Sequence, residues 1–308
     1  MSYLKQLNEK YPVRITKKQK DEFLTYALSL AEKKNVKAQI EQNGKHKNLV
    51  IGNPNTANVV FTAHYDTPNA SLLPNLMLPK NKGLFYAYQF LIIGLLLVVS
   101  LVPAIVVGLY VLQSELAYAG IFLVLYFGLF LLGFKFFKNK NNANDNTSGI
   151  ATVFSILEKL DSKQLDNVAF ILFDNEEKGL LGSKAYQKAH REEMKDKLLI
   201  NLDCVANGDN ILFIAKPKAE ENEQYNLIKR AFASGNDKFN VEFYSTKECV
   251  ANSDHKKFEQ GVCVVACKKS KKGVLYAPYI HTAKDVVADD KNIEFISGRF
   301  ADCFKKSA

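Results

Sequence analysis

The chain has 308 residues, of which 47% are hydrophobic and 24% charged, and this composition is typical of a globular protein with a buried core. The formal net charge of +9 lies largely in short lysine runs, which are typical of solvated faces, and no nucleic-acid-binding motif is present, so we exclude nucleic acid as a partner. Five cysteines without a Cys-x-x-Cys pair indicate free thiols in a reducing cytosol.

The N-terminal part of the chain predicts a helix followed by two short strands. Over residues 16–33, apolar side chains recur at helical spacing between Phe23 and Ala31. Residues 36–40 and 48–51 have strand character, and the polar stretch between them has the composition of a hairpin turn.

The apolar run at residues 59–63 predicts a buried strand that leads directly into His64 and Asp66. Ligands in open α/β sheets bind beyond the carboxyl ends of the strands. We therefore expect His64 to lie at a functional edge of the sheet, with Asp66 as the nearby group that orients its ring.

Residues 83–137 form a long apolar insertion in which two segments lack almost all charge. The segments, residues 84–112 and 117–137, each reach the roughly 20 residues that a helix needs to cross a bilayer. Pro103 is expected to kink the first segment. We predict a two-helix transmembrane hairpin, because a helix that is apolar all round offers no face to water. The alternative is a soluble subdomain of buried helices that forms a lid or a dimer contact.

The charges around this insertion predict its orientation. Lysines flank both ends, whereas the connecting loop carries only Glu115, and the positive-inside rule then places both flanks in the cytosol. An even number of spans also returns the chain to the side from which it started. The flanking lysines are Lys80, Lys82, Lys135, Lys138 and Lys140.

The insertion divides the chain into a discontinuous catalytic domain, residues 1–82 and 138–308, and the hairpin itself. Asp145 follows the insertion and directly precedes a helix predicted over residues 150–160. The free N–H groups and the dipole at a helix start favour a carboxylate. Because a carboxylate at such a junction can offer one oxygen to each of two metal ions, Asp145 is the expected bridging ligand.

Three later apolar runs predict further buried strands of a mostly parallel sheet, at residues 168–173, 198–202 and 262–267. The first leads into Glu176 and Glu177, and the second into Asp203. His281 lies in a loop beyond the third.

Each of these residues alone has an ordinary structural explanation, such as a helix cap or a turn, but the ordered set predicts a metal site. Two histidines and three carboxylates suit a pair of Zn²⁺ ions, with Co²⁺ or Mn²⁺ as possible replacements. Of the adjacent pair, we assign Glu177 as a ligand and Glu176 as the general base. The expected metal ligands are His64, Asp145, Glu177, Asp203 and His281, and the expected catalytic residues are Glu176 and Asp66.

Six motifs in this order resemble those of the co-catalytic zinc aminopeptidases, metallopeptidase family twenty-eight, which also includes glutamate-carboxypeptidase-like enzymes and glutaminyl cyclases. The motifs are AHYDT, NDNTSG, EEKGLLGS, NLD, SDHKKF and HTAKD. The resemblance covers approximately residues 50–70 and 140–290. It implies a phosphorylase/hydrolase-like three-layer α/β/α fold with a mostly parallel mixed central sheet.

The resemblance also implies how the ligands are shared. One metal ion would be bound by His64, Asp145 and Asp203, and the other by Asp145, Glu177 and His281, with Glu176 as the base. It further implies a cis peptide bond between Asp145 and Asn146.

A further group of residues is expected to bind substrate or to support the ligands, namely Asp254, His255, Tyr279 and Asp285. Asp285 lies four residues after His281 and is expected to orient it. Secreted bacterial relatives carry a tyrosine that assists the oxyanion where this chain has Val250. The alternatives for that role are Tyr65, Tyr276, Tyr279 and His255.

These features together predict a dinuclear zinc aminopeptidase that acts on peptides and is anchored in the cell membrane with its catalytic domain facing the cytoplasm. One alternative is a glutaminyl-cyclase-like acyltransferase with a single zinc ion, which metal stoichiometry would separate from the first. The other is a catalytically inactive membrane receptor or scaffold of the same fold. The complete ligand set and the intact Glu176 argue against the inactive alternative.

Overall fold

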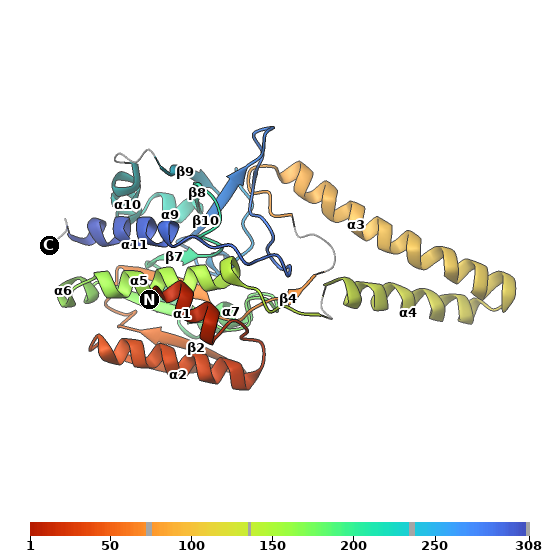
Figure 1. Ribbon diagram of the computed structural model, residues 1–308, viewed down its shortest axis with the longest axis horizontal. Coiled ribbons are helices and arrows are strands. Elements are labelled where there is room, and N and C mark those ends of the chain that lie inside the picture. The colour runs from red at the N-terminus through yellow and green to blue at the C-terminus, as the bar shows by residue number, and fades with distance from the viewer. Residues whose placement is uncertain (72–75, 135–136, 234–237, 306–308) are drawn as a thin grey trace.

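The computed structural model describes residues 1–71, 76–134, 137–233 and 238–305. In these ranges the centre of the fold is a nine-stranded mixed sheet (Figure 1). Its strands are β1 (Ala38–Asn43), β2 (His46–Ile51), β3 (Val59–His64), β6 (Val168–Phe173), β7 (Leu198–Leu202), β8 (Asn210–Ala215), β9 (Asn240–Ser245), β10 (Gly261–Lys269) and β11 (Leu275–Tyr276). The order is β1-β2-β6-β3-β7-β10-β8-β9, and β11 pairs with β10.

The four central strands of the sheet, β6, β3, β7 and β10, run parallel to one another. Antiparallel pairs occur toward both edges, where β1 pairs with β2, β2 with β6, and β8 with β10. Because parallel strands end at the same edge of a sheet, the residues that follow β3, β6 and β7 are brought together there.

Helices cover both faces of the sheet. The helices are α1 (Tyr3–Lys10), α2 (Lys17–Lys33), α5 (Gly149–Lys159), α6 (Ser162–Leu165), α7 (Leu181–Ala189), α8 (Arg191–Met194), α9 (Pro217–Glu220), α10 (Glu223–Ala233), η3 (Asp254–Lys257) and α11 (Asp290–Lys305). Successive strand residues point to opposite faces. Phe61 of β3 therefore packs edge to face on Phe300 of α11, whereas its neighbour Val60 belongs to the cluster that contains Tyr186 of α7. The predicted three-layer α/β/α fold is confirmed.

The apolar insertion forms a helical hairpin that extends away from the sheet, on the side opposite the C-terminus (Figure 1). It consists of α3 (Lys82–Pro103), the π-helical η1 (Ala104–Val111) and α4 (Glu115–Phe134). The α-helical pattern changes to π at Pro103, because proline lacks an N–H group and disturbs the hydrogen-bond ladder. Near the turn, a Cβ atom on Gly108 would lie 2.3 Å from the Cα atom of Tyr118, so the two helices meet there at backbone distance.

The root of the hairpin is tied to the rest of the fold. The strands β4 (Asn69–Ala70) and β5 (Phe137–Lys138) pair antiparallel and join the chain before and after the hairpin. Phe137, expected in the second apolar segment, lies instead in β5. Lys82 Nζ donates a hydrogen bond to the carbonyl oxygen of Thr246 at 3.3 Å. The flanking Lys135 lies outside the described residues.

Candidate metal centre

All five expected ligands lie at the carboxyl edge of the parallel strands. His64 is the last residue of β3, Glu177 follows β6 and Asp203 follows β7. Asp145 lies in the short helical turn η2 (Ala143–Ser148), and its peptide bond to Asn146 is cis, as the resemblance implied. His281 comes from the loop after β11.

Asp145 lies between the two histidines and offers one oxygen to each. Its Oδ1 is 3.4 Å from Nε2 of His64, and its Oδ2 is 3.0 Å from Nε2 of His281. Asp203 Oδ1 is 3.7 Å from Nε2 of His64, and Glu177 Oε2 is 3.2 Å from Nε2 of His281. In the described residues the donor atoms form three groups of three, each with all atoms within 4.8 Å of one another. Two of the groups share Asp145, and the third consists of His64, Glu176 and Glu177.

This arrangement fits a pair of zinc ions. Ligands bound at 2.0–2.2 Å around a tetrahedral ion lie about 3.3–3.6 Å apart, close to the separations seen here. Glu177 Oε1 is buried and has no hydrogen-bond partner, as expected of an oxygen that binds a cation. Imidazole nitrogens and carboxylate oxygens are also the donors that zinc prefers.

The burial of several carboxylates at one site also favours the binding of cations. Burial lowers the pKa of His64, but the negative charge of Glu176 and the hydrogen bond to Asp145 outweigh it and raise this pKa well above its ordinary value. Burial raises the pKa of Glu176 well above its ordinary value, opposed by His64 and reinforced by Glu177. Four carboxylates and two imidazoles thus share one buried site, and bound divalent cations would favour the ionised form of the carboxylates there.

Two buried aspartates hold the loops that carry the ligands. Asp66 accepts hydrogen bonds from the backbone N–H groups of Glu176 at 2.9 Å and Glu177 at 3.2 Å. Asp285 accepts from the N–H groups of Asn144 at 3.0 Å and Asp145 at 2.9 Å. Each aspartate therefore positions two consecutive residues of a distant segment.

These contacts refine the expected roles of both aspartates. His64 Nδ1 lies 3.1 Å from the main-chain oxygen of Asp66 and 3.6 Å from its carboxylate, so the main-chain carbonyl is the closer partner that orients the ring. The backbone hydrogen bonds to the Asp285 carboxylate come from the loop of Asp145. Asp285 therefore supports the bridging ligand, rather than only His281 as the sequence suggested.

The other expected supporting residues lie outside the cavity at the metal centre. Asp254 and His255 begin η3 and are fully buried. Burial raises the pKa of Asp254 to about 7 and, together with the charge of Lys256, lowers that of His255 to about 3. Tyr279 is 49% exposed.

The four residues considered for the oxyanion role do not line this cavity in the described part of the chain. Tyr65 is buried and donates its hydroxyl hydrogen to the carbonyl oxygen of Lys47 at 2.8 Å. Tyr276 lines a different cavity, beside Phe239. The oxyanion role of each of these four residues stays a prediction.

The cavity at the metal centre has a volume of about 400 Å³ and contains residues that the motifs did not indicate. Phe85 and Gln89 of α3 line it together with the ligands, and Asn252 lines it from the loop before η3. No sequence pattern links α3 to the ligands, because the contact depends on how the hairpin is seated on the domain.

Arg14 is a second residue that the sequence did not reveal. It is fully buried, and its backbone N–H donates to Thr67 at 3.0 Å. Its guanidinium donates to the carbonyl oxygens of Tyr65 and Tyr11 and, at 3.2 Å, to the hydroxyl of Thr147. Burial lowers the pKa of Arg14 to about 10, opposed by the charges of Asp66 and Asp145. The hydrogen bonds of Arg14 to Tyr65 and Thr147 connect the loops that carry His64 and Asp145.

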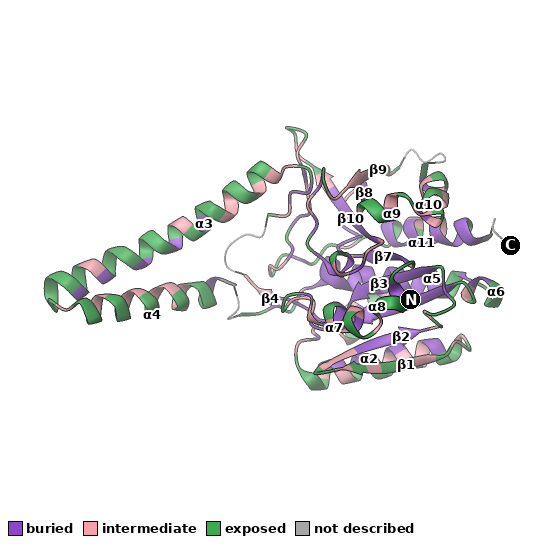
Figure 2. Ribbon diagram, turned by 180° about the vertical axis from the view of Figure 1, so that it is seen from behind, coloured by how far each residue is buried: buried purple, intermediate pink, exposed green. Residues whose placement is uncertain are grey.

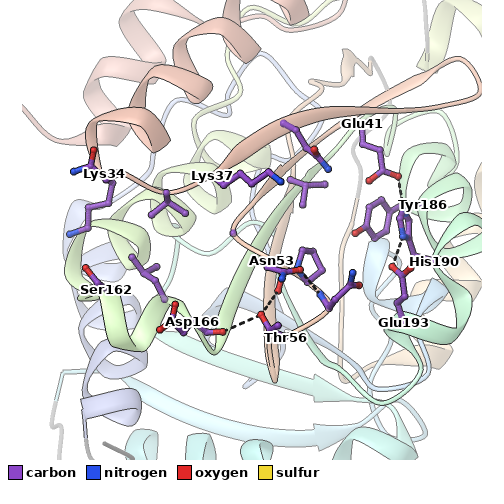
Figure 3. A pocket seen from close by; sticks show the side chains of 18 residues that line it. Lys34, Lys37, Glu41, Asn53, Thr56, Ser162, Asp166, Tyr186, His190 and Glu193 are labelled. Atoms are coloured by element: carbon purple, nitrogen blue, oxygen red, sulfur yellow. Dashed lines mark hydrogen bonds and ion pairs between the residues drawn. The ribbon is translucent and has the colours of Figure 1, made fainter.

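A larger cavity of about 800 Å³ lies beside β1, away from these ligands (Figure 3). His190 stands there between Glu193, 2.6 Å from Nδ1, and Glu41, beside Nε2. Both ring nitrogens therefore face carboxylates, as in an ion-paired imidazolium, and neither is free to bind a metal ion. None of the residues predicted to be functional lines this cavity.

The three-layer fold and the paired His–carboxylate groups define a metallopeptidase. The family model described as peptidase family M28 matches residues 133–295, which is more than half of the chain. The chain therefore belongs to peptidase family M28. The class of enzyme predicted from the motifs is confirmed.

Solved structures confirm the fold at low sequence identity. A zinc-dependent exopeptidase from Parabacteroides distasonis is 15% identical, with a TM-score of 0.60 over 98% of this chain and 95% of that one. A glutaminyl cyclase from Porphyromonas gingivalis is 13% identical, with a TM-score of 0.60 over 99% and 96%. A leucine aminopeptidase precursor from Bacteroides thetaiotaomicron is 16% identical, with a TM-score of 0.56 over 98% and 94%. A search of curated proteins found no match.

Proposed function

We propose that the protein is a dinuclear zinc aminopeptidase anchored in a membrane by its hairpin, with the catalytic domain in the cytosol. The observation that carries the proposal is the position of Asp145, whose two carboxylate oxygens face two different histidines at 3.4 Å and 3.0 Å. The Nε2 atom of each histidine has a further carboxylate beside it, that of Asp203 for His64 and that of Glu177 for His281. One ion needs only one of these two groups of ligands, so the duplicated arrangement supports two ions.

In this proposal the first ion would be held by His64, Asp145 and Asp203, and the second by Asp145, Glu177 and His281. Such ions would supply Lewis acidity toward a carbonyl group and would make a nearby water molecule more acidic. Glu176 lines the same cavity and would take a proton from the attacking water and pass it to the leaving amine. The carboxylate of Asp66 accepts a hydrogen bond from the backbone N–H of Glu176 at 2.9 Å. This contact keeps the Glu176 carboxylate directed at the reacting atoms.

The activity can be tested with aminoacyl-arylamides, whose cleavage releases a coloured amine. We expect hydrolysis by the purified protein, two zinc ions per chain, and loss of activity on chelation that zinc restores. One zinc ion per chain with cyclisation of N-terminal glutamine would instead establish the acyltransferase alternative, which glutaminyl cyclases of the same fold represent. Zinc binding without any turnover would favour the inactive receptor.

The membrane part of the proposal rests on the surface of the hairpin. The two helices are long and apolar enough to cross a membrane, yet only 22% and 6% of their most apolar windows are buried (Figure 2). A core helix would be mostly buried, and a signal sequence would lie near the N-terminus, so neither explanation fits this segment. Phe90, Leu91 and Val124 are among the large side chains left exposed, and an apolar surface of this extent is unstable in water.

Topology can be tested with single cysteines, because the five native cysteines are all buried. Ser114, in the turn between the helices, should react as Ser114→Cys with an impermeant maleimide added to intact cells. The matched control, Ser162→Cys on the exposed α6, should react only after the membrane is opened. Labelling of Ser114→Cys only after the membrane is opened would show that the proposed orientation is wrong. Equal labelling of both variants in a protein found in the soluble fraction would show that the hairpin is not a membrane anchor.

A further inference from the structure

One face of α3 is turned inward, toward α4 and the space between the hairpin and the rest of the fold. Ile92 and Leu96 are 8% and 9% exposed, whereas the adjacent Leu91 and Leu95 are 68% and 55% exposed. Gln89 lies on the same face as Ile92 and Leu96, because residues three, four and seven positions apart share one side of a helix. The hairpin therefore has an inner face that includes Gln89, which also lines the cavity of the metal centre.

This inner face lines a second cavity of about 630 Å³ that adjoins the cavity of the metal centre. The two cavities share three lining residues, Gln89, Glu177 and His281. We call the second cavity the hairpin groove. Its walls beyond the shared residues include Ile92, Ile93 and Leu96 of α3, Phe130 of α4, and Ile15.

The side chains that line the hairpin groove change from ionisable to aliphatic along its length. Near the ligands it is lined by Asp66, Glu177 and His281, and further along α3 by aliphatic side chains. Gln89 and Leu96 are seven positions apart, which corresponds to about 10 Å along a helix, or about three residues of an extended peptide. The groove thus has room for a short extended segment beyond the reacting bond.

We propose that the hairpin groove binds the residues that follow the N-terminal residue of the substrate, and that the substrates are peptides with apolar residues at those positions. The inference rests on the proposed aminopeptidase function and specifies its substrate class. With the hairpin in a membrane, such peptides reach the metal centre along α3 from the bilayer surface.

A peptide fits the hairpin groove better than a lipid does. Seating apolar side chains against Ile92, Ile93 and Leu96 removes the apolar surface of the peptide from contact with water. Gln89 and Asn69 line the same cavity, and their amide groups can both donate to and accept from a peptide backbone. An acyl chain would use the aliphatic wall but would leave these amides without a partner.

The first test compares two tetrapeptides that share an N-terminal leucine and continue with either apolar residues or serines. We expect kcat/KM to be at least tenfold higher for the apolar peptide. Leu96→Asn should lower the ratio of the two kcat/KM values about tenfold, because the wall of the groove becomes polar. Leu95→Asn, one position away on the outer face, should leave that ratio unchanged. A ratio near one in the wild-type protein, or equal effects of the two variants, would overturn the proposal.

The second test does not depend on turnover. A peptide whose fourth residue is a cysteine, activated as a mixed disulfide with thiopyridine, exchanges with a thiol on the protein and releases thiopyridone. Ile93→Cys should be labelled, and an excess of the apolar tetrapeptide should protect it, whereas labelling of Leu95→Cys should not respond to the tetrapeptide. Protection by decanoate as strong as by the tetrapeptide would assign the groove to lipid and contradict the proposal, as would the absence of protection.

The two tests separate failure of the inference from failure of the proposed function. Suppose that hydrolysis of arylamides depends on Glu176, but that apolar peptides are not preferred and Ile93→Cys is not protected. The aminopeptidase proposal would then stand, and the proposal that the hairpin groove binds peptides would be wrong. Absence of any hydrolysis would count against the aminopeptidase, and the labelling of Ile93→Cys would still decide whether the groove binds apolar peptides.

Discussion

Replacing Glu176 by glutamine is expected to lower kcat about a thousandfold while the zinc content stays at the wild-type level. A general base contributes about 10²–10⁴ to the rate, and a thousandfold loss corresponds to about 4 kcal/mol in the activation barrier. Glutamine keeps the size of the side chain but cannot accept the proton. Because the backbone N–H of Glu176 is held by Asp66, the main chain should keep its position in the variant.

The adjacent Glu177→Gln variant is the matched control for this experiment. Glu177 Oε2 lies 3.2 Å from His281, so its replacement should lower the zinc content as well as the activity. The two neighbouring substitutions then separate the base from the ligand by metal analysis alone. Glu176→Gln protein that keeps its zinc and retains more than a tenth of the wild-type kcat would show that another group takes the proton.

Asp145→Asn should abolish activity and reduce the zinc content below one ion per chain. Asp145 faces both histidines, so a neutral amide in its place weakens both ion sites at once. Asparagine has nearly the same volume and keeps the backbone N–H that donates to Asp285 at 2.9 Å, so the loop should remain in place. Zinc content measured after gel filtration, together with circular dichroism of the variant, checks the prediction.

Asp203→Asn provides the comparison, because Asp203 lies beside His64 alone and serves only one of the two proposed ions. We expect this variant to keep about one zinc ion per chain. If Asp145→Asn and Asp203→Asn lose the same amount of zinc, Asp145 does not bridge two ions, and the dinuclear proposal is wrong.

The sequence predicted the helices and strands whose residues have strong local patterns. The capping pair Thr16 and Gln19 begins α2 one residue after the predicted start. The runs at residues 59–63 and 168–173 became β3 and β6, and both strands are buried along their whole length. β8 and β9 were not predicted. β8 pairs with β10 and with β9, and the most distant partners, Asn210 and Cys267, are 57 residues apart in the chain.

The residues of the metal centre were also predicted from local patterns, because each follows a recognisable strand or precedes a recognisable helix. Their separate roles as ligands and base stay predictions until the metal content and the variants are measured. The discontinuous domain, residues 1–82 and 138–308, is likewise a prediction. The support given by Arg14 could not be foreseen, since a lone arginine in a polar segment has no pattern that marks it as buried.

The sequence by itself determined the order of chemical groups along the chain and the apolar hairpin between His64 and Asp145, because strand ends, helix starts and long apolar runs are local properties. Only the tertiary structure decided which atoms meet. The parallel order β6-β3-β7 brings Glu177 and Asp203 to the side of His64, and Asp285 reaches across 140 positions to hold Asp145. The seating of α3 beside these residues also depends on contacts between distant segments. Such contacts follow from packing and sheet order, which no local pattern records.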